Sequence, residues 1–100
     1  MGKDKILNIL KRESVYLHEA YGVRRIALFG SFASDTAGGG SDIDLVIEFD
    51  RPLGFKFFEL SDYLEKALGR KVDILTPDAL TGMRVKSVAR DIQRTMLYVR

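Results

Sequence analysis

Hydrophobic residues recur along the chain at two spacings, which predict helices and strands. Over Lys3–Tyr21 the apolar residues follow helical spacing with charges between them, and Gly22 stands where a helix would end. A second apolar stripe of this kind runs through Phe55–Leu68 and is followed by Gly69. The pattern therefore predicts two amphipathic helices, each ended by glycine.

The last quarter of the chain is predicted to be helical. Thr76-Pro77 has the residues of a helix start, and Gly82 is expected to interrupt that helix. From Met83 to Val99 apolar residues again recur at helical spacing, so we expect a helix whose stripe faces the core. That predicted core stripe consists of Val85, Val88, Ala89, Ile92, Met96 and Val99.

Three shorter apolar runs predict strands: Arg24–Phe29, Asp42–Phe49 and Lys71–Leu75. With the helices, they predict one domain over residues 1–100 of the α/β (α+β) class. We expect a small mixed sheet with helices packed on one face. The other face is expected to be open and to carry acidic side chains.

The charge balance does not indicate a polyanion partner. The chain has 100 residues, of which 16 are basic and 14 acidic, so the formal charge of +2 does not indicate nucleic acid. It has no cysteine and no apolar run long enough to cross a membrane, so we expect a cytoplasmic protein. His18, its one histidine, is expected to lie on a helix surface without a chemical role.

Two carboxylates open the middle strand. Asp42 and Asp44 are one residue apart, so both lie on the polar face, opposite Ile43 and Leu45. Two such charges about 4 Å apart repel by about 4 kcal/mol at an effective dielectric of about 20. A hard cation such as Mg²⁺ would remove this repulsion. The alternative is that one aspartate only caps or solvates the start of the strand.

The turn after the preceding strand predicts a phosphate site. Gly30 allows close approach of a ligand, and Ser31 offers a hydroxyl beside the free N–H groups of a helix start. The alternative is a strand-to-helix turn in which Ser31 is only the N-cap.

A third acid, Asp73, alternates with Val72 and Ile74 in the last of the three strands. If that strand lies beside the Asp42 strand with its core face turned the same way, the three carboxylates converge. Alone, Asp73 would be interpreted as a solvent-facing strand residue.

The segment GSFASDTAGGGSDIDLVIEF (residues 30–49) resembles the signature of the nucleotidyltransferase superfamily typified by DNA polymerase beta, in its minimal (MNT) form. Leu64–Ala79 resembles the segment in which that family places its third acid, here Asp73. The chain departs from the family pattern at Ser34-Asp35, where many members have Arg-Gly.

The resemblance implies a polymerase beta-like nucleotidyltransferase fold and a set of site residues. Asp42, Asp44 and Asp73 would be catalytic and would bind two Mg²⁺ ions when substrate is present. Gly30 and Ser31 would bind the nucleotide. Asp73 would also accept the proton of the attacking hydroxyl.

The resemblance also implies a biological role, that of the MntA-like antitoxins of HEPN/MNT toxin–antitoxin pairs. Such a protein transfers AMP from ATP to a tyrosine of its HEPN-type toxin, and it would form a homo- or hetero-oligomer. Two alternatives stay open. One is a binding module that neutralises its partner without catalysis, and the other is a transferase acting on a small molecule.

Overall fold

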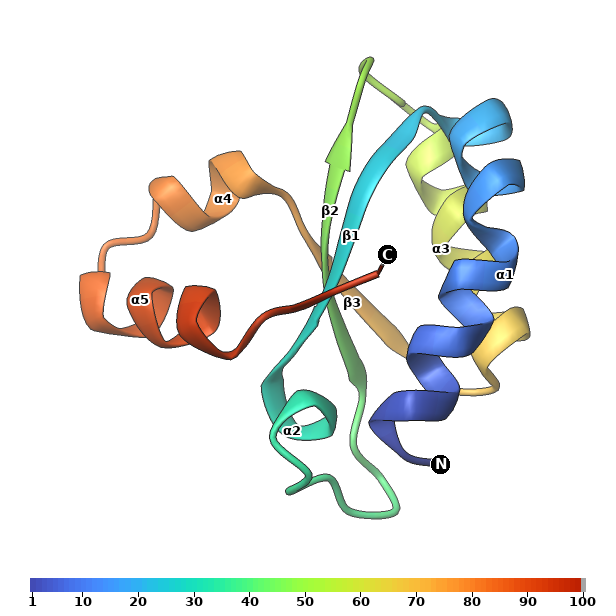
Figure 1. Cartoon of the computed structure of the whole chain (residues 1–100). Helices are drawn as coiled ribbons and strands as arrows, with labels where there is room; N and C mark the ends of the chain where they lie inside the picture. Colours follow the sequence, from blue (N-terminus) through green and yellow to red (C-terminus); the bar gives the residue numbers. More distant parts are fainter. Residues whose placement is uncertain (100) are drawn as a thin grey trace.

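The computed structural model describes residues 1–99, which form a four-stranded sheet between two groups of helices (Figure 1). The strands lie in the order β3-β2-β1-β4; β2 and β3 are parallel, and the other pairs are antiparallel. The sheet is therefore mixed, which confirms the predicted class. The elements are α1 (Lys3–Tyr21), β1 (Val23–Phe29), α2 (Gly30–Ala33), β2 (Ile43–Phe49), α3 (Lys56–Leu68), β3 (Val72–Leu75), α4 (Pro77–Thr81), α5 (Lys86–Thr95) and β4 (Leu97–Tyr98).

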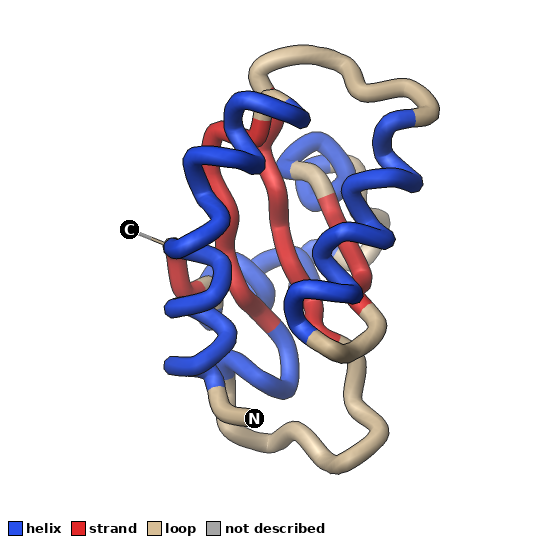
Figure 2. The backbone as a smooth tube through the Cα atoms, turned by 90° about the vertical axis from the view of Figure 1, so that its right-hand side faces the viewer, coloured by secondary structure: helices blue, strands red, loops and turns tan. Residues whose placement is uncertain are grey.

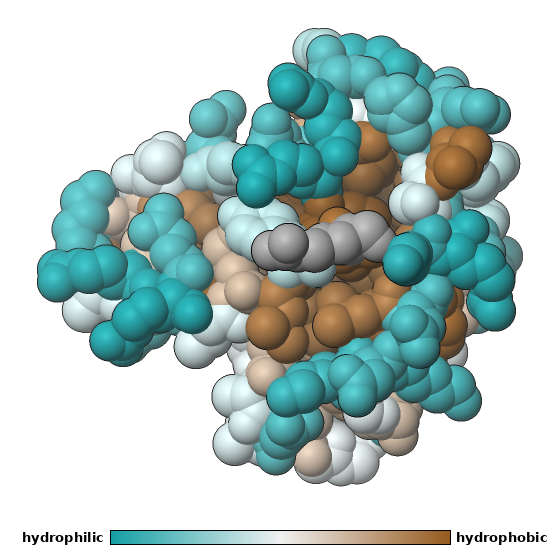
Figure 3. All heavy atoms as spheres, in the orientation of Figure 1, coloured by the Kyte–Doolittle hydropathy of each residue, from teal (hydrophilic) through white to brown (hydrophobic). Residues whose placement is uncertain are grey.

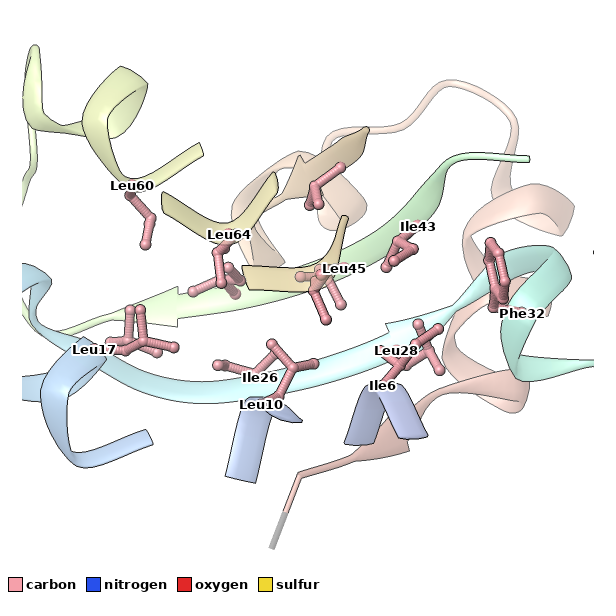
Figure 4. Packing of buried hydrophobic residues seen from close by; sticks show 14 of the residues in the cluster. Ile6, Leu10, Leu17, Ile26, Leu28, Phe32, Ile43, Leu45, Leu60 and Leu64 are labelled. Atoms are coloured by element: carbon pink, nitrogen blue, oxygen red, sulfur yellow. The ribbon is translucent and has the colours of Figure 1, made fainter. Parts of the chain in front are cut away.

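The main core lies between the sheet and the helices α1 and α3, which run across one face (Figures 1 and 2). Ile43, Leu45 and Ile47 alternate along β2 and all point into this core, as their spacing predicts. Figure 4 shows Ile43 and Leu45 among leucines of both helices, with Phe32 of α2 at one end. The core thereby fixes which side chains of β2 point the other way.

The second face of the sheet is not fully open, which differs from our expectation. Ala27, Phe29 and Val46 alternate with the core residues, so they lie on that second face, and they pack with Leu80 of α4. The side chain of Ile92, on α5, packs against this smaller cluster. Helices α4 and α5 therefore cover part of the face that carries Asp44.

The expectation of one helix from Met83 to Val99 was wrong at both ends. The helix α5 spans only Lys86–Thr95, and the next residues form β4, whose Leu97 and Tyr98 pair with β1. Val85 and Val88, predicted to be in the core, are 56% and 47% exposed. The sheet edge offers β4 backbone partners that helical periodicity does not reveal.

Other expectations are confirmed. The Thr76 hydroxyl accepts a hydrogen bond of 3.2 Å from the Ala79 N–H, and α4 ends before Gly82. His18 is exposed on α1, with its Nδ1 atom 3.1 Å from the carbonyl oxygen of Val23. No helix within residues 1–99 is long and apolar enough to cross a membrane.

Candidate active site

The parallel register of β2 and β3 brings two acids together. Asp44 lies directly beside Asp73, and Leu45 beside Ile74. Because laterally paired residues of neighbouring strands share a face, both carboxylates lie on the side opposite the main core. Asp73 is exposed and Asp44 half-buried. Strand β3 thus lies beside β2 with its core face turned the same way, which is the arrangement under which these acids were expected to converge.

Asp42 completes the acidic group from just before β2. It is half-buried and lines a shallow surface depression with Arg70 and Lys71. Partial burial, then the charge of Asp73 and that of Asp42, raise the pKa of the Asp44 carboxyl above its usual value. The three carboxylates therefore repel one another, and the effect falls on Asp44, whose ionised form is destabilised.

Gly30 packs its backbone against this group. Its φ angle is +74°, a conformation that side chains rarely adopt, and a Cβ atom there would overlap Oδ2 of Asp44. The turn from β1 into α2 thus lies against the central carboxylate. Ser31, the next residue, is half-buried in the first turn of α2, where N–H groups have no partner inside the helix.

The Ser34-Asp35 departure has a structural account. Ser34 Oγ donates to the Gly30 carbonyl oxygen at 3.0 Å, closing the short helix α2. Asp35 has a φ of +59°, a left-handed conformation that glycine would adopt without strain. Its carboxylate pairs with the Lys3 ammonium at 3.0 Å. The anion is therefore partly neutralised by α1.

Arg70, which the sequence pattern did not single out, lies at the candidate site beside Asp42. Its Nη1 donates to the carbonyl oxygens of Gly39, at 3.0 Å, and of Ser41, at 3.5 Å. Its guanidinium also lies 5.2 Å from the ring centroid of Phe32 in α2. The Arg70 side chain thereby ties together the segments that carry Gly30, Asp42 and Asp73. An arginine three residues before the third acid was the available signal.

We expect Arg70→Lys to lower kcat/KM for nucleotidyl transfer about tenfold and to raise the Mg²⁺ concentration needed for half-maximal rate. A lysine is shorter and lacks the planar guanidinium that lies over Phe32 while its Nη1 bonds the two carbonyls, so the Asp42 loop would shift. Rates measured against Mg²⁺ concentration check this, with Lys66→Arg on α3 as the control. A lower melting temperature with unchanged Mg²⁺ dependence would make Arg70 merely structural.

The other candidate cations lie elsewhere. Arg24 and Arg25 both face Glu48, at 3.6 and 4.0 Å, near the end of β1 remote from Gly30. They are therefore engaged at the far end of the sheet from the acidic group.

The residues present fit a hard divalent cation. Carboxylate oxygens are its preferred ligands, and the raised pKa of Asp44 marks a place where added positive charge would be stabilising. Within residues 1–99 no group of three or more acidic, histidine or cysteine side chains is placed so that it could hold a metal ion. Mg²⁺ generally takes one or two protein carboxylates and completes its shell with water and substrate phosphates.

Comparison with known proteins agrees with this geometry. A family model described as a nucleotidyltransferase domain matches residues 3–95. The protein adenylyltransferase MntA of Thermococcus cleftensis is 37% identical over 90 residues, covering 89% of this chain and 91% of that protein. A Methanocaldococcus jannaschii protein, provisionally named a protein adenylyltransferase, is 40% identical over 96 residues, covering 95% of each chain.

Solved structures show the same fold. One described provisionally as a minimal nucleotidyltransferase superposes with a TM-score of 0.71 at 26% identity, covering 97% of this chain and 95% of that one. A chain from the complex of tri-AMPylated Shewanella oneidensis HEPN toxin with MNT antitoxin gives a TM-score of 0.59 at 18% identity, covering 94% and 71%.

The chain therefore belongs to the nucleotidyltransferase domain family, in its minimal (MNT) branch with the MntA-related adenylyltransferases. It is an enzyme of the nucleotidyl-transfer class, a family that generally uses divalent metal ions.

Proposed function

We propose that this protein is a Mg²⁺-dependent protein adenylyltransferase that transfers AMP from ATP to a tyrosine hydroxyl of a HEPN-type toxin, and so acts as its antitoxin. Relatives named protein adenylyltransferases support AMP as the transferred group. The partner is supported by the AMPylated HEPN toxin with its MNT antitoxin, to which the fold is similar. We infer that residues 1–100 form one catalytic domain.

The observation that carries this proposal is the register of the two parallel strands. It places Asp44 beside Asp73, with Asp42 one residue before β2 and the Gly30 backbone against Asp44. Strand β3 is the outer strand of the sheet, so Asp73 lies toward an edge where a second protein can approach. An acidic group of this kind, next to a glycine turn, suits phosphoryl chemistry at an edge open to a large acceptor.

Each residue then has a role in the transfer. Gly30 and Ser31 hold the outer phosphates through backbone N–H groups and the Ser31 hydroxyl. Asp42 and Asp44 would hold the divalent ion that binds the phosphates. Asp73 accepts the proton of the tyrosine hydroxyl, whose oxygen forms the new bond to the α-phosphorus. The bond between that phosphorus and the bridging oxygen to the β-phosphate breaks, and pyrophosphate leaves.

Two Mg²⁺ ions held by the three aspartates and the phosphates would neutralise charge on the leaving pyrophosphate and lower the pKa of the attacking hydroxyl. Arg70 acts through the loop that carries Asp42 and is a positioning residue.

The direct test is transfer of label. The protein, a HEPN-type toxin and Mg²⁺ are incubated with ATP labelled at the α-phosphate. We expect label on the partner, its loss with Asp42→Ala or Asp44→Ala, and its loss when EDTA removes the metal. A tyrosine-to-phenylalanine change at the labelled site of the partner identifies the acceptor atom.

The main competing function is neutralisation by binding alone. A stoichiometric complex that carries no label, and that both aspartate variants form equally well, would replace the catalytic proposal by that one. Label on an added small hydroxyl compound but not on the partner would favour a small-molecule transferase.

A further inference from the structure

A cavity of about 200 Å³ lies on the same face of the sheet as Asp44, between the strands and the helices α4 and α5. Its apolar walls come from Val46 of β2, Leu80 of α4 and Met96, which follows α5. In Figure 1 these two helices lie on the side of the sheet opposite α1 and α3, and Figure 3 shows this part of the molecule projecting from the main body. The cavity is where that projecting part meets the strands.

Polar and charged residues also line this cavity, among them Arg25 of β1 and Glu48 of β2. The side chains of Thr81 and Gln93 line it from α4 and α5, and both are exposed rather than committed to the core. Tyr98 of β4 adds an aromatic ring, with the Arg25 guanidinium 4.6 Å from its centroid. Apolar walls with a few hydrogen-bonding groups are typical of sites for flat heteroaromatic rings.

The position relative to the acids sets what can bind there. Val46 is two residues beyond Asp44 on the same strand, so the cavity begins about 7 Å from that carboxylate. It involves β1, β2 and β4, whereas Asp73 lies on β3 at the opposite edge of the sheet. A nucleotide whose α-phosphate lies at Asp44 can extend its base into the cavity and leave the Asp73 side free for an acceptor.

We propose that the cavity lined by Val46, Leu80, Met96, Thr81 and Gln93 binds the purine base of the nucleotide. This inference rests on the proposed function, because it takes the phosphates to lie at Gly30 and Asp44. The Gln93 amide, which both donates and accepts, contacts the edge of the base, and Val46 and Met96 contact its faces. The short segment from α5 to β4 thereby makes the protein selective for a nucleoside triphosphate over inorganic polyphosphate.

The test compares a ligand that has a base with one that lacks it. Binding of ATP and of inorganic tripolyphosphate, each with Mg²⁺, is measured by calorimetry on the wild type and on Gln93→Trp, which fills the cavity from an exposed helix position. We expect the Kd for ATP to rise about tenfold or more and the Kd for tripolyphosphate to stay unchanged. Gln93→Ala, which removes only the amide, is expected to give a smaller change of the same kind.

Arg94→Trp is the matched control, because it puts the same large side chain at the next position of α5, where the native side chain is 79% exposed and paired with Asp91. Its Kd for ATP is expected to stay at the wild-type value, and melting temperatures of all variants report folding. If Gln93→Trp binds ATP as the wild type does, or weakens ATP and tripolyphosphate equally, the cavity is not the base site. If the wild type binds neither ligand, the proposed function itself fails.

Discussion

Asp44→Asn is expected to lower the rate of AMP transfer by a factor of about 10³ while raising the melting temperature at pH 7 by about 2–5 °C. The rate falls because the asparagine amide is a poor ligand for a hard cation. The folded state becomes more stable because Asp44 is half-buried beside Asp73, with Asp42 nearby, and the substitution removes its charge. Transfer of α-labelled phosphate and thermal unfolding by circular dichroism measure the two effects.

The pH dependence of the stability gain follows from the sign of the pKa shift. Burial and the neighbouring aspartates raise the pKa of Asp44 in the folded state above its unfolded value, so the folded state binds this proton more tightly. The contribution of the protonated Asp44 carboxyl to wild-type stability is therefore fully present below the pKa of the unfolded state. It is lost as the pH rises through the higher pKa of the folded state. The advantage of Asp44→Asn is expected at neutral pH and should vanish near pH 3.

Asp62→Asn is the control for this prediction, because it removes an exposed carboxylate on α3, outside the acidic group. We expect it to change neither the rate nor the pH profile. If the Asp44→Asn variant kept full transferase activity, the Asp44 carboxylate would have no role in the mechanism.

Gly30→Ala is expected to reduce AMP transfer at least about 100-fold and to destabilise the fold by about 1–2 kcal/mol. The added Cβ would overlap Oδ2 of Asp44, and the φ of +74° is strained for alanine. The carboxylate and the turn would have to separate, which displaces both the phosphate contacts and the metal ligand. Steady-state rates and urea unfolding measure the two losses.

Gly40→Ala is the matched control, since a Cβ at Gly40 meets nothing within 4 Å and this residue has no positive φ angle. The same substitution there is expected to leave activity and stability close to wild type. If Gly30→Ala lost stability but kept its transfer rate, close packing of this turn on Asp44 would be a folding requirement only.

Features set by local patterns were predictable from the sequence. The helix Lys3–Tyr21 ends where expected because Gly22 adopts a φ of +69°, which glycine reaches without strain. Asp73 could be assigned to the site because residues of a strand alternate between faces, and the structure then supplied the pairing with Asp44. The roles of the five predicted site residues stay predictions until the variants are measured.

Features that depend on contacts between distant segments were not predictable. The contacts of Arg70 with Gly39, Ser41 and Phe32 span about thirty residues or more of sequence, and no spacing rule encodes them. The change from α5 to β4 is of the same kind, because a free sheet edge on β1 outweighs helical periodicity. The cavity between the strands and the helices α4 and α5 depends on this switch from helix to strand, because Met96 and Tyr98 would not line it if α5 continued.

The parallel pairing of β2 with β3 limits how this protein can vary in evolution. A one-residue insertion or deletion in the turn between α3 and β3, left uncompensated, would turn the Asp73 side chain toward the leucines and bring Val72 or Ile74 to the acidic face. The run of three glycines before Ser41 carries no such constraint on side-chain size, because a Cβ added at any of them meets nothing nearby. Homologues are therefore expected to differ in residue type at these glycines and to keep the length of the α3–β3 turn constant.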